Sequence, residues 1–305
     1  MIETVELTKK YQDVLALDHL NLVVGAGEIF GYIGPNGAGK TTTIRILSGL
    51  MRPTSGQATV ADVDVVKHPQ EAKKVVGYMP DIFGVYQGMR VWEYLDFFGA
   101  AYRMSRAVRR PRIDEVLHIT GTDEMRDYFV DSLSRGMQQK VQFIGTLIHD
   151  PDLVILDEPF SGLDPINAQA LKDTVVELRR RGKTVIFSTH LMDNAERLCD
   201  SVCIIAGGKK VLDGTVSGVK AEHGARNVEQ CEQLVVPLHG VDIEQQRPAR
   251  IADVGHVARS AGQPPDQERV DGPEQHLALR RAGAKTIGRV QQVLDLGARE
   301  IGIEQ

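Results

Sequence analysis

Residues 34–41 read GPNGAGKT, which has the residue types and spacing of a loop that binds phosphate groups. Glycines let the backbone curl so that successive amide N–H groups point at one anion, and a helix that starts here adds its positive end. Lys40 supplies a cation for the β and γ phosphates, and the Thr41 hydroxyl is a hard oxygen ligand of the kind that Mg²⁺ prefers. A dinucleotide-binding loop fits less well because the G-x-G-x-x-G order is absent. The loop therefore predicts a nucleoside triphosphate site.

Two adjacent acids, Asp157 and Glu158, follow the apolar run LVIL at 153–156. A short apolar run between turn residues predicts a buried parallel strand, and open α/β sheets bind ligands where such strands end. Asp157 can hold a metal ion there, and Glu158 can polarise a water molecule in line with the γ phosphate. Paired acids at a strand end are also common in solvated turns, but the complete phosphate loop favours the functional interpretation.

The elements that would position these residues alternate between strands and helices. We expect strands at 2–7, 20–24, 29–33, 153–156 and 184–188, and helices at 41–50 and 165–181. The segment from about 89 to 150 has an almost wholly helical pattern, with candidate helices at 91–104, 113–119 and 134–149. Strands separated by helices predict an α/β fold with a largely parallel sheet and an inserted helical subdomain at about 89–150.

Between the two motifs lies DSLSRGMQQK, and with it the chain resembles the nucleotide-binding domain of ABC transporters. The family's signature Leu-Ser-Gly-Gly-Gln corresponds here to Leu133, Ser134, Arg135, Gly136 and Met137. The resemblance implies a P-loop NTPase fold with antiparallel N-terminal strands, and two domains that pair head to tail. Ser134, Gly136 and Met137 of one chain would then contact the γ phosphate held by Lys40 of the other. Taken alone, Ser134 would be explained as an ordinary helix N-cap.

The remaining family motifs occur in order along the chain. They imply that Tyr11 stacks on adenine, that Ser161 and Asp164 lie at the dimer seam, and that His190 contacts the γ phosphate. Without the resemblance, Tyr11 would be explained by packing and His190 by a structural role.

The resemblance also assigns the residues of the nucleotide site itself. The implied catalytic residues are Glu158, His190 and Lys40. Contacts to ATP would come from Tyr11, Gly34, Asn36, Gly37, Ala38, Gly39, Lys40, Thr41 and Thr42. The Mg²⁺ ligands would be Thr41, Asp157 and Asp81. Asp81 stands where the family has a glutamine, so a solvated turn residue is the alternative at that position.

Composition agrees with a globular protein outside the membrane. The chain has 305 residues, a formal charge of −5 and 42% apolar residues, which argues against disorder and against a polybasic nucleic-acid binder. No apolar run is long enough to span a bilayer, and the N-terminus lacks the apolar core of a signal peptide, so we expect a peripheral protein on the cytoplasmic face of the membrane. The basic run at 103–112 fits either a solvated helix face or a surface that meets anionic lipid.

All aromatic residues fall between Tyr11 and Phe187. Every motif also precedes residue 215, so we expect a nucleotide-binding domain at 1–218 and a small C-terminal appendage at 219–305. The composition of that appendage suits either a small accessory region or a partly disordered one.

These observations lead to one main functional hypothesis and two alternatives. The resemblance implies a subunit that binds and hydrolyses ATP with Mg²⁺, dimerises on ATP and powers export through a separate membrane permease, without nucleic acid. The first alternative is a soluble ABC-type ATPase that acts on ribosomes or DNA, and the second is a regulatory nucleotide-binding subunit with little turnover.

Overall fold

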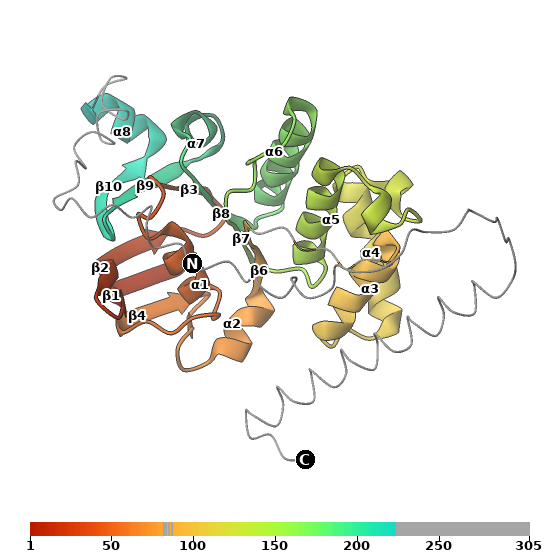
Figure 1. Ribbon diagram of the computed structural model, residues 1–305, viewed down its shortest axis with the longest axis horizontal. Helices are drawn as coiled ribbons and strands as arrows, with labels where there is room; N and C mark the ends of the chain where they lie inside the picture. The colour runs from red at the N-terminus through yellow and green to blue at the C-terminus, as the bar shows by residue number, and fades with distance from the viewer. Residues whose placement is uncertain (82–83, 85, 87, 224–305) are drawn as a thin grey trace, which may run out of the picture. The chain divides into compact units, whose positions relative to one another are not determined.

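The computed structural model of the chain describes residues 1–81, 84, 86 and 88–223 (Figure 1). Of the expected C-terminal appendage, residues 224–305 therefore lie outside the described residues.

Two β-sheets form the framework of the described part. The larger sheet has the strand order β10-β9-β3-β8-β7-β6, and the smaller has the order β2-β1-β4-β5. The larger sheet is parallel except where β10 meets β9, and the smaller sheet is antiparallel throughout. The larger sheet contains β3 (Ile29–Ile33), β6 (Val76–Met79), β7 (Leu153–Leu156), β8 (Thr184–Thr189), β9 (Ser201–Ala206) and β10 (Lys209–Thr215). The smaller sheet contains β1 (Ile2–Tyr11), β2 (Val14–Val24), β4 (Ser55–Val60) and β5 (Val63–Asp64).

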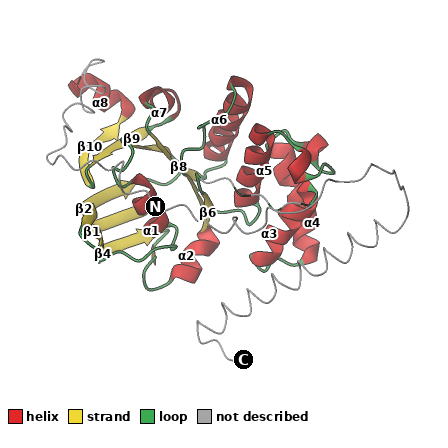
Figure 2. Cartoon of the chain, in the orientation of Figure 1, coloured by secondary structure: helices red, strands yellow, loops and turns green. Residues whose placement is uncertain are grey.

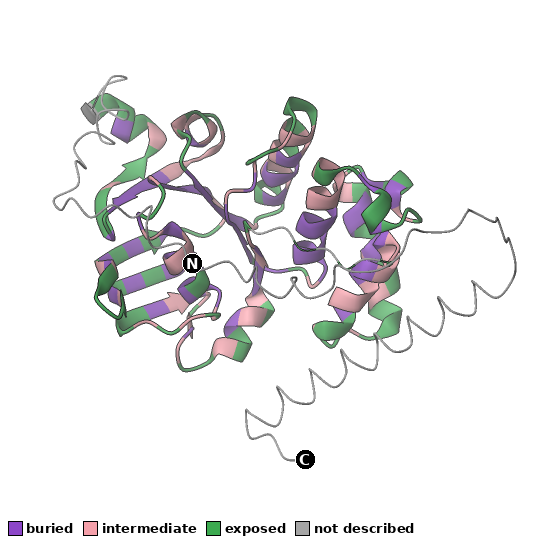
Figure 3. Cartoon of the chain, in the orientation of Figure 1, coloured by how far each residue is buried: buried purple, intermediate pink, exposed green. Residues whose placement is uncertain are grey.

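The central strands β3, β7 and β8 are buried at every position (Figure 3). Apolar side chains cover both faces of a parallel sheet, so its strands read as continuous apolar runs. On β3, Ile29 and Ile33 belong to one hydrophobic cluster, whereas Phe30 and Tyr32 belong to the other. The strand that leads into the phosphate loop is therefore fixed from both sides.

Helices surround the sheets and also form a group of their own (Figure 2). The helices are α1 (Lys40–Leu47), α2 (Pro69–Val75), α3 (Val91–Ala101), α4 (Arg106–Ile119), α5 (Arg135–Leu147), α6 (Pro165–Arg180), α7 (Met192–Leu198) and α8 (Val216–His223), with short 3₁₀ turns at Asp123–Met125 and Val130–Ser132. Figure 1 shows α3, α4 and α5 gathered beyond the β6 edge of the larger sheet. This group occupies the segment for which the helical subdomain is predicted.

Helix α4 is longer than its predicted range, since it starts at Arg106 and contains Pro111. A proline inside a helix removes one backbone hydrogen bond. Side-chain contacts hold α4 in place on both sides of this position. Arg109 Nε donates to Asp96 Oδ1 at 2.7 Å, and Arg112 Nη2 donates to the Leu147 carbonyl oxygen at 2.9 Å.

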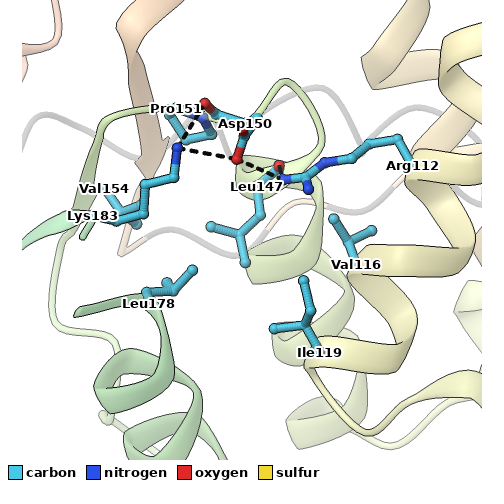
Figure 4. Close-up of a pocket in the computed structure, with 9 residues that line it drawn as sticks. All are labelled: Arg112, Val116, Ile119, Leu147, Asp150, Pro151, Val154, Leu178 and Lys183. Carbon is cyan, nitrogen blue, oxygen red and sulfur yellow. Dashed lines mark hydrogen bonds and ion pairs between the residues drawn. The ribbon is translucent and has the colours of Figure 1, made fainter. Parts of the chain in front are cut away.

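The helical group is tied to the sheet through Asp150 (Figure 4). Arg112 Nη2 from α4 donates to Asp150 Oδ1 at 3.1 Å, and Lys183 Nζ, just before β8, lies 3.1 Å from the same oxygen. The small pocket beside this network is lined by apolar residues such as Val116 and Leu178 and by none of the predicted site residues. Arg109 and Arg112, which belong to the basic run, are thus paired with acids of the protein itself.

Over the ranges that the structure describes, the helices are all too short or too polar to cross a bilayer.

Candidate functional site

The phosphate loop joins the end of β3 to the start of α1. Gly39 has φ 106° and Gly37 has φ 80°, and residues other than glycine rarely adopt a backbone φ in this positive range. A Cβ on Gly39 would also lie 2.6 Å from the carbonyl oxygen of Ala16 on β2. Both positions therefore favour glycine, and at Gly39 a Cβ would also collide with β2. The curled backbone of the loop leads directly into the N-terminus of α1.

Lys40, the first residue of α1, has its ammonium group inside this loop. Its Nζ donates to the carbonyl oxygens of Gly34 at 2.6 Å and Pro35 at 3.2 Å, and the residue is 6% exposed. A buried ammonium group needs partners, and here the loop's own carbonyl oxygens supply them. If a phosphate group bound to the loop, its oxygen could replace those carbonyl oxygens as the hydrogen-bond acceptor of this ammonium group. Thr41 and Thr42 follow in the first turn of the same helix.

Asp157 is placed at the carboxyl end of β7 and is 2% exposed. Its Oδ1 accepts a hydrogen bond from Ser188 Oγ at 2.6 Å, whereas its Oδ2 is buried without a hydrogen-bond partner. An ionised oxygen without a partner in the interior is unfavourable, and a divalent cation would satisfy it. Across the described residues there is no cluster of three or more His, Cys, Asp or Glu side chains that could hold a metal by themselves. The site fits Mg²⁺, which typically takes one or two carboxylates and completes its shell with hydroxyl, water and phosphate oxygens.

Glu158 lies between two nitrogen groups. Its Oε1 is 3.4 Å from Lys40 Nζ, which is an ion-pair distance without hydrogen-bond geometry, and its Oε2 is 3.0 Å from His190 Nδ1. The backbone of Glu158 is left-handed, with φ 48°, and its N–H donates to Ser188 Oγ at 3.0 Å. Its Oε1 is thus a buried oxygen without a hydrogen-bond partner beside the Lys40 ammonium group, where it could accept a proton as a general base does.

Asp81 follows Pro80 at the end of β6. Asp81 is exposed, but loss of hydration on its buried side raises the pKa of its carboxyl group, the negative charges of Asp157 and Glu158 raise this pKa further, and Lys40 lowers it. Asp81 is therefore close enough for its charge to act on the two acids that follow β7. The structure brings the three carboxylates and Lys40 into one electrostatic environment.

The signature segment is placed at the start of a different helix. Ser134 caps α5, with its Oγ accepting from the Met137 N–H at 3.4 Å. Gly136 packs against the start of α6, because a Cβ there would lie 2.8 Å from Asn167 Nδ2. Asn167 in turn donates to Asp164, the N-cap of α6, at 2.5 Å. Hydrogen bonding to Asn167 lowers the pKa of the Asp164 carboxyl group, and this keeps the cap ionised.

Ser134 and Lys40 belong to two separate parts of one chain. Both residues are described, and neither a hydrogen bond nor an ion pair joins them. Ser161 lies in the turn that links Glu158 to α6, since its N–H donates to the Glu158 carbonyl oxygen at 3.1 Å. The chain therefore carries one phosphate-binding loop and a second, separate helix start that could meet another phosphate group.

Tyr11 is the last residue of β1, and it pairs with Val14 on β2. This register places it near Ala16, whose carbonyl oxygen contacts the phosphate loop. The phenol group is 41% exposed, donates to Met51 Sδ at 2.8 Å, and has Lys9 Nζ 5.1 Å from its ring centroid. These side-chain contacts lie beyond the C-terminal end of α1 and on β1, so the stacking of Tyr11 on adenine stays a prediction.

Comparison with known proteins agrees with this arrangement. A family model described as ABC transporter matches residues 17–161. An uncharacterised ABC transporter ATP-binding protein of Methanocaldococcus jannaschii is 41% identical over 218 residues, which are 72% of this chain and 79% of that protein. The chain belongs to the ABC transporter ATP-binding protein family. A probable multidrug ABC transporter ATP-binding protein of Escherichia coli is 37% identical over 222 residues, or 73% of this chain but only 38% of that protein.

Solved structures of the family have the same fold. The ATP-binding subunit of an ABC transporter is 30% identical, with a TM-score of 0.69 over 78% of this chain and 100% of that one. A bacterial ABC transporter cassette solved as a dimer is 25% identical, with a TM-score of 0.64 over 71% of this chain and 99% of that one. These matches confirm the predicted α/β P-loop NTPase fold with its largely parallel sheet and antiparallel N-terminal strands. They also establish the chain as an ATP-binding member of an ATPase family.

Sequence reasoning missed Ser188, which lies on β8 two residues before His190 and contacts both Asp157 and Glu158. A small polar residue directly after the run TVIF of the buried strand β8 was the available signal. Asp157 and Glu158 lie 31 and 30 positions before Ser188 in the sequence, so only the pairing of β7 with β8 reveals the contact.

Proposed function

We propose that two copies of this chain bind ATP with Mg²⁺ between them, hydrolyse it, and drive export through a separate membrane permease. The observation that carries this proposal is the position of the Glu158 carboxylate, 3.4 Å from Lys40 Nζ and 3.0 Å from His190 Nδ1. A base beside the cation that binds the terminal phosphate is well placed to take a proton from an attacking water molecule.

The phosphate loop would bind the triphosphate through its backbone N–H groups. Phosphate oxygens would replace the Gly34 and Pro35 carbonyl oxygens as partners of Lys40 Nζ. Asp157 Oδ2 and the Thr41 hydroxyl would hold Mg²⁺, with Asp81 reaching it directly or through water. The bound metal neutralises charge on the β and γ phosphates.

Glu158 would act as the general base and His190 would hold it in place. The Oε2–Nδ1 contact limits the rotation of the carboxylate, so that Oε1 remains on the side of Lys40. The side chain of His190 is 44% exposed, which leaves its other ring nitrogen free to approach a γ phosphate oxygen. The expected result is in-line attack by water, with ADP and phosphate as products.

A second copy would complete the site through its signature segment. Ser134, Gly136 and Met137 of one chain would meet the γ phosphate bound to Lys40 of the other, with Ser161 and Asp164 at the seam. Ser134 at the start of α5 and Lys40 at the start of α1 share no hydrogen bond within one chain, and a dimeric cassette with 25% identity supports their meeting between two chains. Tyr11 would stack on the adenine of the nucleotide.

The membrane partner is a permease subunit, and the chain would act at the cytoplasmic face as a peripheral protein. Membership of the ABC transporter ATP-binding protein family supports this proposal, as does a relative with 37% identity that bears the name of a probable multidrug ABC transporter ATP-binding protein. Nucleic acid has no role in this proposal.

The proposal is tested by the rate of phosphate release at rising protein concentration. A shared site predicts that turnover per molecule rises with concentration at first and then reaches a plateau, because the active species is the dimer. Turnover per molecule that does not change with dilution would point to a monomeric ATPase, and absence of turnover would point to a regulatory subunit. Fractionation of native cells adds a second test, since co-sedimentation with ribosomes in place of membranes would contradict coupling to a permease.

A further inference from the structure

Ser188 connects the two acids that follow β7. It lies on β8 and is completely buried, with 0% exposure. Its Oγ is 2.6 Å from Asp157 Oδ1 and 3.0 Å from the backbone nitrogen of Glu158. One hydroxyl group thus contacts the side chain of the first acid and the backbone of the second.

The direction of both hydrogen bonds follows from the groups involved. The Glu158 N–H can only donate, so the Ser188 oxygen is the acceptor in that bond. The hydroxyl proton is then available for Asp157 Oδ1, and the short 2.6 Å distance is typical of an O–H group that donates to a carboxylate. The serine therefore uses its donor and one of its acceptor positions on the two acids.

The bond to Asp157 decides which carboxylate oxygen is free. With Oδ1 occupied by Ser188, Oδ2 remains without a hydrogen-bond partner in a buried position. The bond to the Glu158 N–H holds the backbone of a residue whose φ of 48° is unfavourable for residues other than glycine. The first bond leaves Asp157 Oδ2 as the oxygen available to a metal ion, and the second fixes the backbone of Glu158, whose Oε1 lies 3.4 Å from Lys40 Nζ.

We propose that Ser188 is a positioning residue for metal-dependent ATP binding, which orients Asp157 Oδ2 toward Mg²⁺ and fixes the backbone of Glu158. This inference rests on the proposed function, since it assumes that Mg²⁺ binds at Asp157. Groups that orient a metal ligand typically change metal affinity or activity by 10-fold to 100-fold when they are removed.

A buried serine on a central strand could also serve stability alone, and Thr184 on the same strand provides the control. Thr184 is 1% exposed, and its hydroxyl accepts a hydrogen bond from the Gly27 N–H at 2.9 Å. It lies at the first position of β8, whereas Ser188 lies one residue before the end. Thr184→Val removes a buried hydroxyl from the same strand without touching either acid.

The experiment measures the Kd of a fluorescent ATP analogue, first in EDTA and then in excess Mg²⁺, for the full-length chain and its variants. Ser188→Ala should leave the Kd in EDTA within about twofold of the original, because Lys40 and the loop are unchanged. In excess Mg²⁺ the Kd should rise about tenfold. Ser188→Thr should show the same effect of Mg²⁺ on the Kd as the original chain, because threonine keeps the hydroxyl group. Thr184→Val should also show the full effect of Mg²⁺ on the Kd, although its melting temperature should be lower.

A Ser188→Ala protein that melts at a lower temperature but retains the full effect of Mg²⁺ on the Kd would overturn the inference, since Ser188 would then serve stability alone. If the alanine variant does not fold, Ser188→Cys gives the same test, because a thiol is a weaker donor in the same position. A starting protein whose ATP affinity does not respond to Mg²⁺ would contradict the proposed function itself, whatever the variants do.

Discussion

Glu158 and His190 contact each other across the ends of two parallel strands, with Oε2 of the carboxylate 3.0 Å from Nδ1 of the ring. The strands β7 and β8 are hydrogen-bonded neighbours in the sheet, so their carboxyl ends lie at one edge. Lys40 reaches the same carboxylate from α1, at 3.4 Å. Three elements that are distant in sequence therefore meet at one acid.

Replacement of Lys40 by alanine should remove most of the ATP affinity. The ammonium group is the buried cation of the phosphate loop, and hydrogen bonds between charged partners contribute about 1.5–3 kcal/mol. We expect the Kd for ATP, measured by calorimetry, to rise about 100-fold. Lys67→Ala is the control, since this lysine is exposed and pairs with Asp64. Equal affinities in the two variants would contradict the role of Lys40.

Asp81→Gln should change metal dependence more than catalysis. Asp81 adds a third negative charge near Asp157 and Glu158, so ATP binding in the absence of metal should be weaker with aspartate than with glutamine. We expect hydrolysis to stay within about tenfold, under roughly 1.4 kcal/mol in the barrier, and ATP binding to depend less on Mg²⁺. ATP titrations with and without Mg²⁺ check this, and an identical metal dependence in both proteins would make Asp81 a turn residue only.

His149 should make the protein less stable in acid. Its ring stacks on Tyr102 with centroids 3.6 Å apart and contacts the Val76 carbonyl oxygen at 3.1 Å. Burial is the main reason why the pKa of His149 is lowered to about 4; the positive charges of Arg112 and Lys183 lower it further, whereas Asp150 and the Val76 carbonyl group raise it.

The sign of this effect follows from proton binding. Between pH 6.5 and about 4 the unfolded chain binds a proton at His149 that the folded chain does not, so stability is complete above pH 6.5 and falls as the pH falls. From pH 7 to 5 the loss should be about 2 kcal/mol from this residue. Urea unfolding of the original chain and of His149→Gln checks it, because glutamine does not titrate. Equal losses of stability in the two proteins would show that His149 does not titrate as described.

Truncation tests the predicted boundary at residue 218. This position falls inside α8, and the next residue, Val219, is 3% exposed and belongs to a hydrophobic cluster. A chain that ends at residue 223 should fold and bind ATP, since every predicted site residue is retained. A chain that ends at 218 should lose about 1.5–3 kcal/mol through the missing valine. Chemical denaturation of both truncations measures the difference, and failure of the longer one to bind ATP would contradict a nucleotide domain that folds without the tail.

Sequence patterns were most informative where one element carries one strong signal. The predicted strand at 29–33 and the predicted helix starting at 165 match β3 and α6, because an apolar run before glycines and a capping Asp164 before proline are local features. Strands such as β4 and β5 were not predicted, since the first half of β4 is exposed and polar and β5 has only two residues. The predicted helix at 113–119 is shorter than α4, which starts at Arg106 and includes Pro111, and the contact of Arg109 with Asp96 on α3 is a tertiary contact that the local sequence does not reveal.

In the candidate site too, short motifs could be predicted from the sequence, whereas contacts between distant elements could not. The phosphate loop is one short stretch of sequence and the two acids are another, so the residue types within each stretch alone indicated a nucleotide site. The contact of Glu158 with His190 depends on the order of strands in the sheet, and the packing of Gly136 against Asn167 depends on how α5 meets α6. Neither contact leaves a pattern within a short window of sequence.

In the proposed site, ATP binds between two copies of the chain and Glu158 is the base. The most direct test is size-exclusion chromatography of Glu158→Gln with ATP and Mg²⁺, because loss of the base should stop turnover while ATP still binds through Lys40. General bases contribute about 10²-fold to 10⁴-fold to a rate, so the bound ATP should persist during the run. We predict that Glu158→Gln elutes as a dimer with ATP and as a monomer without it. A variant that binds ATP with Mg²⁺ and still elutes as a monomer at high protein concentration would contradict the shared site.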